Sequence, residues 1–157
     1  MTQEKYECAP GSMVLLTRLA KQVYRRSTEE LLGMQLRHLV VLSYLSDHER
    51  APQGELAETF CMDANNVVLL LNELEDLGYA ARRRDPSDRR RHIVELTDEG
   101  RSALMGAEGA QEQIEGEVLN ALDAQERATL WRLLTRALQG AEAEEPALGA
   151  TIAPVSA

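Results

Sequence analysis

Aromatic residues and cysteines are scarce in this chain of 157 residues. Aromatics make up 4% of it, with one tryptophan and one phenylalanine, so a core of Leu, Val and Ala in a helical protein is expected. Cys8 and Cys61 form neither a disulfide framework nor a CxxC metal pair. The sequence has no stretch of about 18 apolar residues and no N-terminal apolar run with a cleavage site. We therefore expect a cytoplasmic protein that is neither secreted nor inserted in a membrane.

Motifs of enzymes and metal proteins are also lacking. The sequence contains no Gly-rich phosphate loop, no GxSxG and no cluster of histidines with carboxylates. His38, His48 and His92 are too scattered to predict a metal site. We expect no enzymatic activity, no cofactor and no metal.

Positive charge is concentrated in one place. The formal net charge is −9, yet residues 82–91 read RRRDPSDRRR, with six arginines in ten residues. Pro86 restricts φ, and Asp85 and Asp88 favour Asx turns. Residues 92–97 then alternate as a β-strand does. The pattern predicts a hairpin with arginines at its tip and flanks, suited to a groove lined with phosphates.

Helical periodicity precedes this hairpin. Apolar residues recur at helical spacing in residues 12–33 and again from Leu36 to Leu45. Residues 53–60 are about two helical turns long, and Asp63 can cap a longer helix that ends at Gly78. A short helix, a tight turn and a longer helix, followed at once by the hairpin, indicate a winged helix-turn-helix.

Two further helices are predicted after the hairpin. Thr97 or Asp98 begins the first, in which Gly106, Gly109 and Gly116 each cost about 1 kcal/mol relative to alanine. Residues 123–126 form a capping box for the last helix. The apolar faces at both ends of the chain exceed what a small winged-helix domain covers. A homodimer built from the terminal helices is therefore predicted, with an intramolecular bundle as the alternative.

The predicted fold class is mainly α (α+β), a winged helix-turn-helix with N- and C-terminal dimerisation helices. Its order is two helices, a short optional strand, the helix-turn-helix pair, a strand, the wing, a strand and two helices. The expected parts are a flexible N-terminal arm (1–11), an N-terminal dimerisation helix (12–33), the winged helix-turn-helix DNA-binding region (34–97), C-terminal dimerisation helices (98–139) and a disordered tail (140–157).

From about Leu15 to Leu138 the chain resembles the MarR (multiple-antibiotic-resistance regulator) family of bacterial transcription factors. The resemblance is carried by residues 53–57 (QGELA), 72–83 (NELEDLGYAARR), 85–91 (DPSDRRR) and 94–100 (VELTDEG). It implies a two-fold dimer whose winged heads bind successive major grooves. It also implies control of a promoter that is often relieved by a small phenolic ligand or by thiol oxidation.

Asn65 and Asn66 are expected in the first turn of the recognition helix, where side chains meet base edges. An asparagine amide can pair with adenine N6 and N7. The alternative is that one of them only caps the helix alongside Asp63. Leu69 departs from the family, in which a polar or basic residue is common there, and could contact a thymine methyl group. Asn72 is expected to reach a phosphate.

In the wing, the resemblance implies that Asp88 holds a neighbouring arginine while Arg90 enters the minor groove, whose narrow A·T-rich form attracts arginine. Residues 82–84 are expected to meet phosphates or the domain's own acidic groups. The predicted DNA-binding set is Gln53, Asn65, Asn66, Leu69, Asn72, Arg84, Asp88, Arg89, Arg90 and Arg91.

An effector pocket is expected between the dimer helices and the DNA-binding region, for a small phenolic or other apolar-acidic ligand. Its polar candidates, each equally suited to the surface or an interface, are Arg18, Gln22, Arg37, His38 and Tyr44. Cys61 is expected to be a small buried hydrophobe, with a reactive thiol as the alternative. Peroxide sensing through Cys8 is not expected, because it lies three residues upstream of the family's reactive position and Leu36 and Leu39 replace the tyrosine pair.

The sequence thus predicts a homodimeric, sequence-specific regulator that binds a pseudo-palindromic operator in double-stranded DNA. We expect a repressor that a small-molecule effector releases. The alternatives are a winged-helix protein-interaction module and a thiol-redox regulator that uses Cys61.

Overall fold

The structure is a computed structural model that describes residues 10–143. These residues divide into two compact units after Val118. The predicted N-terminal arm up to residue 9 and the predicted tail from residue 144 lie outside the described residues. Residues 140–143 belong to the last helix, so the expectation of disorder was wrong for this stretch.

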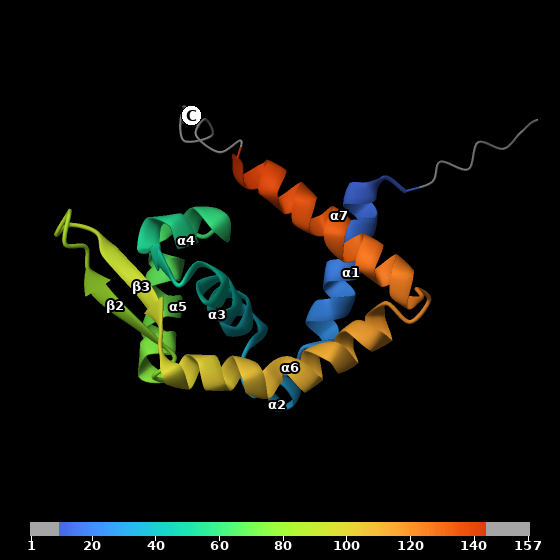
Figure 1. Cartoon of the computed structure of the whole chain (residues 1–157), viewed down its shortest axis with the longest axis horizontal. Coiled ribbons are helices and arrows are strands. Elements are labelled where there is room, and N and C mark those ends of the chain that lie inside the picture. Colours follow the sequence, from blue (N-terminus) through green and yellow to red (C-terminus); the bar gives the residue numbers. More distant parts are fainter. Residues whose placement is uncertain (1–9, 144–157) are drawn as a thin grey trace, which may run out of the picture. The chain divides into compact units, whose positions relative to one another are not determined.

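The first unit follows the predicted order, with one additional short helix. Its helices are α1 (Ser12–Arg26), α2 (Glu29–Leu32), α3 (Leu36–His48), α4 (Gln53–Thr59), α5 (Ala64–Asp76) and α6 (Asp98–Val118). Its strands are β1 (Arg50–Pro52), β2 (Ala80–Arg84) and β3 (His92–Leu96). They form an antiparallel sheet in the order β1-β3-β2, beside α4 and α5 (Figure 1).

The N-terminal helix is shorter than the leucine pattern predicts. It ends at Arg26, where Ser27 folds its hydroxyl back to the Val23 carbonyl oxygen. The Thr28 hydroxyl then accepts a hydrogen bond from the Leu31 N–H and starts α2. Gly33, at φ 72°, ends that helix in the left-handed conformation. Local side-chain capping therefore divides residues 12–33 into two helices.

The core lies between α3, α4, α5 and β3. Its fully buried large side chains are Leu42, Leu45, Leu56, Leu70, Leu71, Leu74 and Val94. Because Val94 faces this core from the central strand, the sheet and the helix-turn-helix share one apolar interior. The sequence expectation of an aliphatic core is confirmed.

The connection between β3 and α6 is tightly held. Thr97 donates its N–H to the Tyr79 carbonyl oxygen and its hydroxyl to the Gly78 carbonyl oxygen. The same hydroxyl accepts from the Gly100 N–H at 3.0 Å, which caps α6. From this point α6 passes α3, α2 and α1, with which it is in contact (Figure 1).

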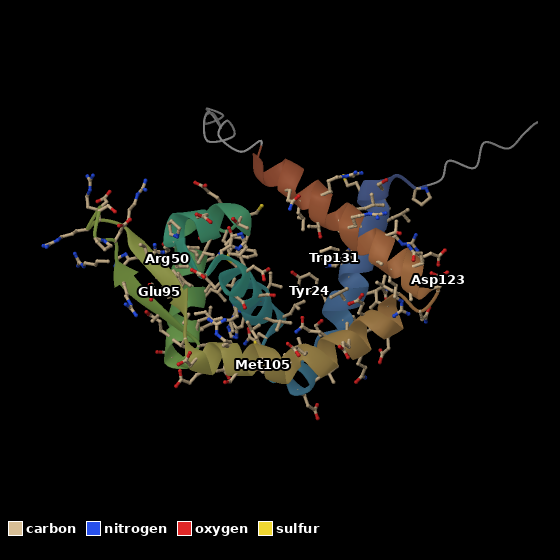
Figure 2. All side chains as sticks on the ribbon, viewed as in Figure 1. Tyr24, Arg50, Glu95, Met105, Asp123 and Trp131 are labelled. Atoms are coloured by element: carbon tan, nitrogen blue, oxygen red, sulfur yellow. The ribbon has the colours of Figure 1, made fainter. Side chains whose placement is uncertain are left out.

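The second unit contains the last helix, α7 (Ala124–Ala143). Asp123 and Glu126 form the predicted capping box, each accepting a hydrogen bond of 2.9 Å from the other's backbone N–H. None of the described residues of α7 is buried, and Trp131 is 70% exposed (Figure 2). No helix among residues 10–143 is long and apolar enough to cross a membrane.

Candidate nucleic-acid interface

The helix-turn-helix is formed by α4 and α5. Between them Cys61 has φ 51°, and Met62 donates its N–H to the Ala57 carbonyl oxygen at 2.8 Å. Asp63 caps α5 as predicted, because its Oδ1 accepts from the N–H groups of Asn65 and Asn66 at 3.0 and 2.8 Å. The start of α5, the recognition helix, is therefore rigidly defined.

One face of α5 is buried and the other is exposed. Val67, Leu70, Leu71 and Leu74 belong to the core, as the apolar ladder predicts. The predicted contact residues Asn65, Asn66, Leu69 and Asn72 are all exposed. The Asn66 amide donates to Asp63 Oδ2 at 2.7 Å, so this asparagine is bonded to the residue that caps α5.

Two carboxylates fasten α5 to its surroundings, and sequence reasoning assigned neither of them a role. Glu73 accepts from Arg37 of α3 at 2.9 Å, and its Oε2 lies 2.7 Å from Nε2 of the buried His38. The hydrogen bond with His38, together with the charge of Arg37, holds the pKa of Glu73 below its ordinary value against the effect of desolvation.

Two residues further along the helix, Glu75 connects α5 to β2. It accepts hydrogen bonds from the backbone N–H of Arg82 at 2.9 Å and from its guanidinium group. That guanidinium also donates to the Asn72 side-chain oxygen. The side-chain bond from Arg82 lowers the pKa of Glu75, with desolvation opposing it. Arg82 thus meets the domain's own acid, which was one of the two predicted alternatives.

The wing consists of β2, β3 and the loop of residues 85–91. Asp85 accepts from the Ser87 N–H and hydroxyl, both at 2.8 Å, and Asp88 accepts from the Arg90 N–H at 3.1 Å. These are the predicted Asx turns. The Ser87 bonds also lower the pKa of Asp85. The Asp85 N–H closes the loop on the Arg91 carbonyl oxygen at 3.0 Å.

The six arginines of residues 82–91 differ in what they contact. Arg83 pairs with Glu95 at 3.1 Å, and Arg84 donates to the Arg89 carbonyl oxygen at 3.5 Å. The Asp88 carboxylate lies 3.3 Å from the guanidinium of Arg90 and 3.9 Å from that of Arg91.

Asp88 therefore contacts Arg91 and also Arg90, the arginine that was expected to enter the minor groove. The Arg90 side chain nevertheless remains 92% exposed. Within residues 10–143 the Arg89 side chain has no hydrogen-bond or ion-pair partner. The positive charges of Arg89 and Arg90 at the tip of the wing are therefore exposed to solvent.

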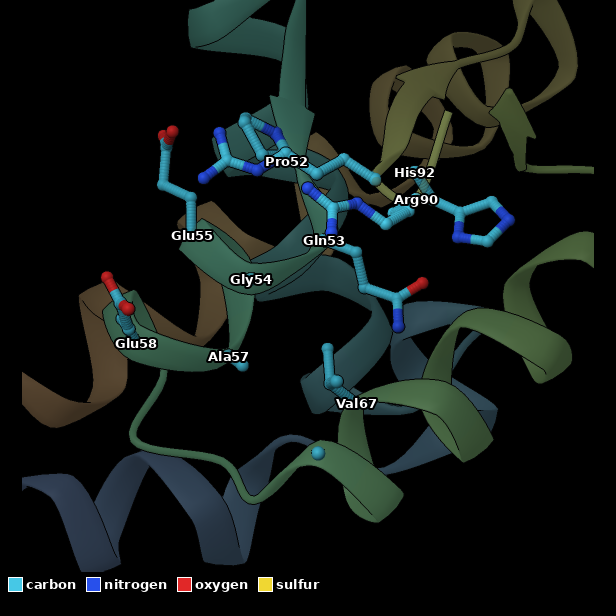
Figure 3. Close-up of a pocket in the computed structure, with 11 residues that line it drawn as sticks. Pro52, Gln53, Gly54, Glu55, Ala57, Glu58, Val67, Arg90 and His92 are labelled. Atoms are coloured by element: carbon cyan, nitrogen blue, oxygen red, sulfur yellow. The ribbon is translucent and has the colours of Figure 1, made fainter. Parts of the chain in front are cut away.

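A cavity of about 510 Å³ is lined by residues of both the wing and the helix-turn-helix. Gln53 at the start of α4, Ala64 and Val67 of α5, and Arg90 and Arg91 line it, among others. Figure 3 shows the Gln53 side chain between Val67 and the wing residues Arg90 and His92. The fold therefore brings Gln53, the recognition helix and the wing to one surface, although they are far apart in the sequence.

The predicted effector residues are not gathered in the same way. Gln22 bonds within α1 to Arg25 and Arg26, and the Tyr44 hydroxyl donates to Glu55 at 2.7 Å. Arg37 alone of the five lines one of the two cavities described here, the second of about 440 Å³. Arg18 is exposed on α1, and His38 is buried beneath α5 with its Nδ1 unpartnered. Their role in effector binding remains a prediction.

Cys61 is exposed, so the expectation of a buried hydrophobe was wrong. The left-handed turn places Cys61 outside the core, while Met62 packs against it. Cys8 lies outside the described residues. Among residues 10–143 there is no group of three or more histidine, cysteine, aspartate or glutamate residues that could hold a metal.

Comparison with known proteins finds similar sequences and a similar solved structure. Residues 32–91 match the family model described as MarR family. The HTH-type transcriptional regulator YdgJ of Bacillus subtilis is 32% identical over 104 residues, which span 66% of this chain and only 63% of YdgJ. The HTH-type transcriptional repressor NicR of Pseudomonas putida is 28% identical over 130 residues, 79% of this chain and 82% of NicR. A MarR crystal structure superimposes with a TM-score of 0.75 at 23% identity, covering 90% of this chain and 94% of that one.

Proposed function

Because this chain belongs to the MarR family of winged helix-turn-helix transcriptional regulators, we propose that it binds a specific sequence in double-stranded DNA. The observation that carries the proposal is the common surface of α4, α5 and the wing around one cavity. An exposed helix face next to exposed arginines suits a major groove and the adjacent phosphates. The proposed contacts are those predicted from the sequence, with Asn65 and Leu69 on bases and Arg89 and Arg90 in the wing.

The active form in this proposal is a homodimer. Helix α1 buries none of its residues, and its exposed side chains include Met13, at 76%. Tyr24 of the same helix, labelled in Figure 2, is 70% exposed. Met105 of α6 is also exposed, at 65%. A second copy of the chain would cover these exposed apolar side chains. A two-fold dimer would recognise a pseudo-palindrome whose half-sites are about one helical turn apart.

Regulation is proposed to be repression, in line with the relative NicR, which is named a transcriptional repressor. Release by a small phenolic or other apolar-acidic effector follows from the family resemblance. The exposed thiol of Cys61, next to the recognition helix, supports the redox alternative. A thermal-shift and DNA-affinity screen of phenolic acids, with and without oxidant, tests both, since an unchanged melting curve and affinity throughout would eliminate them.

The wing assignment is tested by Arg90→Ala. Loss of one phosphate or groove contact is expected to weaken binding to all DNA sequences. It should also reduce the log–log slope of affinity against salt by about one. The measurement is DNA affinity of the full chain by fluorescence anisotropy across a range of salt concentrations.

Arg101→Ala is the matched control, because Arg101 is also an exposed arginine but lies just beyond the opposite end of β3. The control should leave the slope unchanged. An Arg90→Ala protein with the wild-type affinity and slope would contradict the assignment of the wing.

A further inference from the structure

We propose that α5 reads A·T base pairs in each half-site, with the Asn65 amide on an adenine and the Leu69 side chain on a thymine methyl group. The inference rests on the proposed DNA-binding function and adds which bases the major-groove helix selects. Three observations support it: which side chains of α5 are exposed, which already have hydrogen-bond or ion-pair partners, and the lack of arginine and lysine in this helix.

The recognition helix lacks the side chains that read guanine. Guanine O6 and N7 are typically bound by arginine or lysine. Residues 61–76, the turn and the whole of α5, contain neither. The arginines of the wing belong to another element, so they do not replace a basic residue on the helix itself.

Three of the four acidic residues at 63–76 are not available for cytosine either, and the fourth, Asp76, lies at the end of α5 opposite the first turn that meets base edges. A carboxylate can accept a hydrogen bond from cytosine N4. Glu73 is engaged with Arg37 and His38. Glu75 is engaged with Arg82, and Asp63 caps the helix. Besides Ala64 and Asp76 at its two ends, the exposed residues of α5 are three asparagines and Leu69.

Among the three asparagines of α5, Asn65 is the one whose side-chain amide has both its N–H donor and its carbonyl acceptor free to bind a base. Bidentate pairing with adenine needs both the amide N–H donor and the carbonyl acceptor. Asn66 already donates to Asp63 at 2.7 Å, and the Asn72 oxygen accepts from Arg82. Within residues 10–143 the Asn65 side chain has no hydrogen-bond partner. It also lies in the first turn of α5, which faces base edges when such a helix enters the groove.

Leu69 stands one turn after Asn65 on the same face, since residues i and i+4 are neighbours on a helix. It is 58% exposed, although the other leucines of its helix, Leu70, Leu71 and Leu74, are at most 1% exposed. The thymine 5-methyl group is the apolar feature of the major groove. Four residues rise about 6 Å along the helix, so the thymine should lie within about two base pairs of the adenine.

The test begins with in vitro selection of randomised DNA duplexes on the full chain, in excess competitor DNA. We expect each selected half-site to contain an adenine and a thymine within about two base pairs of each other. In the selected duplex, each thymine is then replaced by deoxyuridine, which lacks only the 5-methyl group. A single replacement, in one half-site, should weaken binding about fourfold, the effect of removing about 0.8 kcal/mol of apolar contact.

The protein variants assign these effects to residues. Leu69→Ala should abolish the sensitivity to deoxyuridine, and Asp76→Ala, an exposed residue at the end of the same helix, should retain it. Asn65→Ala removes one amide–adenine pair from each half-site, so it should lower affinity about thirtyfold or more and abolish the sensitivity to 7-deazaadenine, which lacks N7.

The outcomes separate the two proposals. If no duplex is enriched over competitor, the DNA-binding function itself fails. If a specific duplex is enriched but deoxyuridine has no effect at any position, or the half-site positions are invariant G·C pairs, the inference fails and the function stands. The deoxyuridine comparison uses the wild-type protein alone, so it is decisive even if a variant does not fold.

Discussion

At the scale of single residues, carboxylates position the recognition helix. Glu73 connects α5 to α3 through Arg37 and His38, and Glu75 connects it to β2 through Arg82. Both have lowered pKa values, so both bind their partners as carboxylates at neutral pH. The arginines and asparagines that face outward depend on these inner contacts for their orientation, because the same helix carries both sets.

The Glu75 contact predicts a pH dependence of stability. Its folded-state pKa lies below the ordinary 4.5, so its contribution is fully present above about pH 5 and is lost as pH falls through the folded pKa. Glu75→Gln should therefore flatten the acid limb of the stability profile. The measurement is the free energy of urea unfolding from neutral to acidic pH.

The control for this experiment is Glu58→Gln, on the exposed surface of α4. It should leave the acid limb as in the wild type. If Glu75→Gln had the wild-type slope throughout the acid range, the Arg82 contact would not contribute to stability as described.

At the scale of elements, the first turn of α6 lies very close to the end of the β2–β3 hairpin. A Cβ on Gly100 would lie 2.1 Å from the Tyr79 carbonyl oxygen and 2.8 Å from Leu96 Cδ1. Tyr79 is held there because its carbonyl oxygen also accepts from the Thr97 N–H at 3.1 Å. The first turn of α6 can therefore pack on the end of the hairpin only with a glycine at this position.

Gly100→Ala is expected to destabilise the protein by about 1–3 kcal/mol, since the backbone must shift to admit the methyl group. That strain outweighs the gain in helix propensity of about 1 kcal/mol. Gly109→Ala in the same helix meets nothing within 4 Å and should be neutral or stabilising. Thermal and urea unfolding of both variants test the contrast, which would be refuted by an equal effect at the two sites.

At the scale of the whole molecule, the first and last helices carry apolar side chains that remain exposed to solvent. Helix α1 has no buried residue, and the described part of α7 has none, with Trp131 and Leu138 exposed at 70% and 62%. By contrast, α3, α4 and α5 bury their apolar faces within the winged helix-turn-helix. A homodimer would give the terminal helices a partner and place two recognition helices on one DNA duplex.

Leu16→Glu is the corresponding prediction. Leu16 is 48% exposed on α1, so its replacement leaves the core intact but puts a charge in the proposed interface. Sedimentation velocity should show monomers, and affinity for a two-half-site duplex should fall while the far-ultraviolet circular dichroism is unchanged. Lys21→Glu, at an exposed polar position of the same helix, should remain dimeric. A dimeric Leu16→Glu protein would exclude α1 from the interface.

Much of the fold could be predicted because its signals are local. The Asp63 cap, the left-handed Gly78, the Asx turns of Asp85 and Asp88 and the box of residues 123–126 all appear where the sequence indicates. Each depends on residues within a few positions of each other. The break at Ser27 and Thr28 was missed because the leucine spacing runs through it, whereas the hydroxyl bonds that cause it carry no periodic signal.

The sequence by itself determined the order of the elements, the arginine wing and the residues that a recognition helix would present, because caps, turns and helical periodicity act over short distances. Only the tertiary structure decided which of those side chains are held by partners within the protein and which stay exposed. It engages Glu73 with Arg37 and His38, 36 and 35 positions away, and Asn72 with Arg82. It leaves Cys61, Asn65 and Leu69 exposed. Such partnerships form when helices and strands distant in the chain pack on a common core, and no local pattern encodes them.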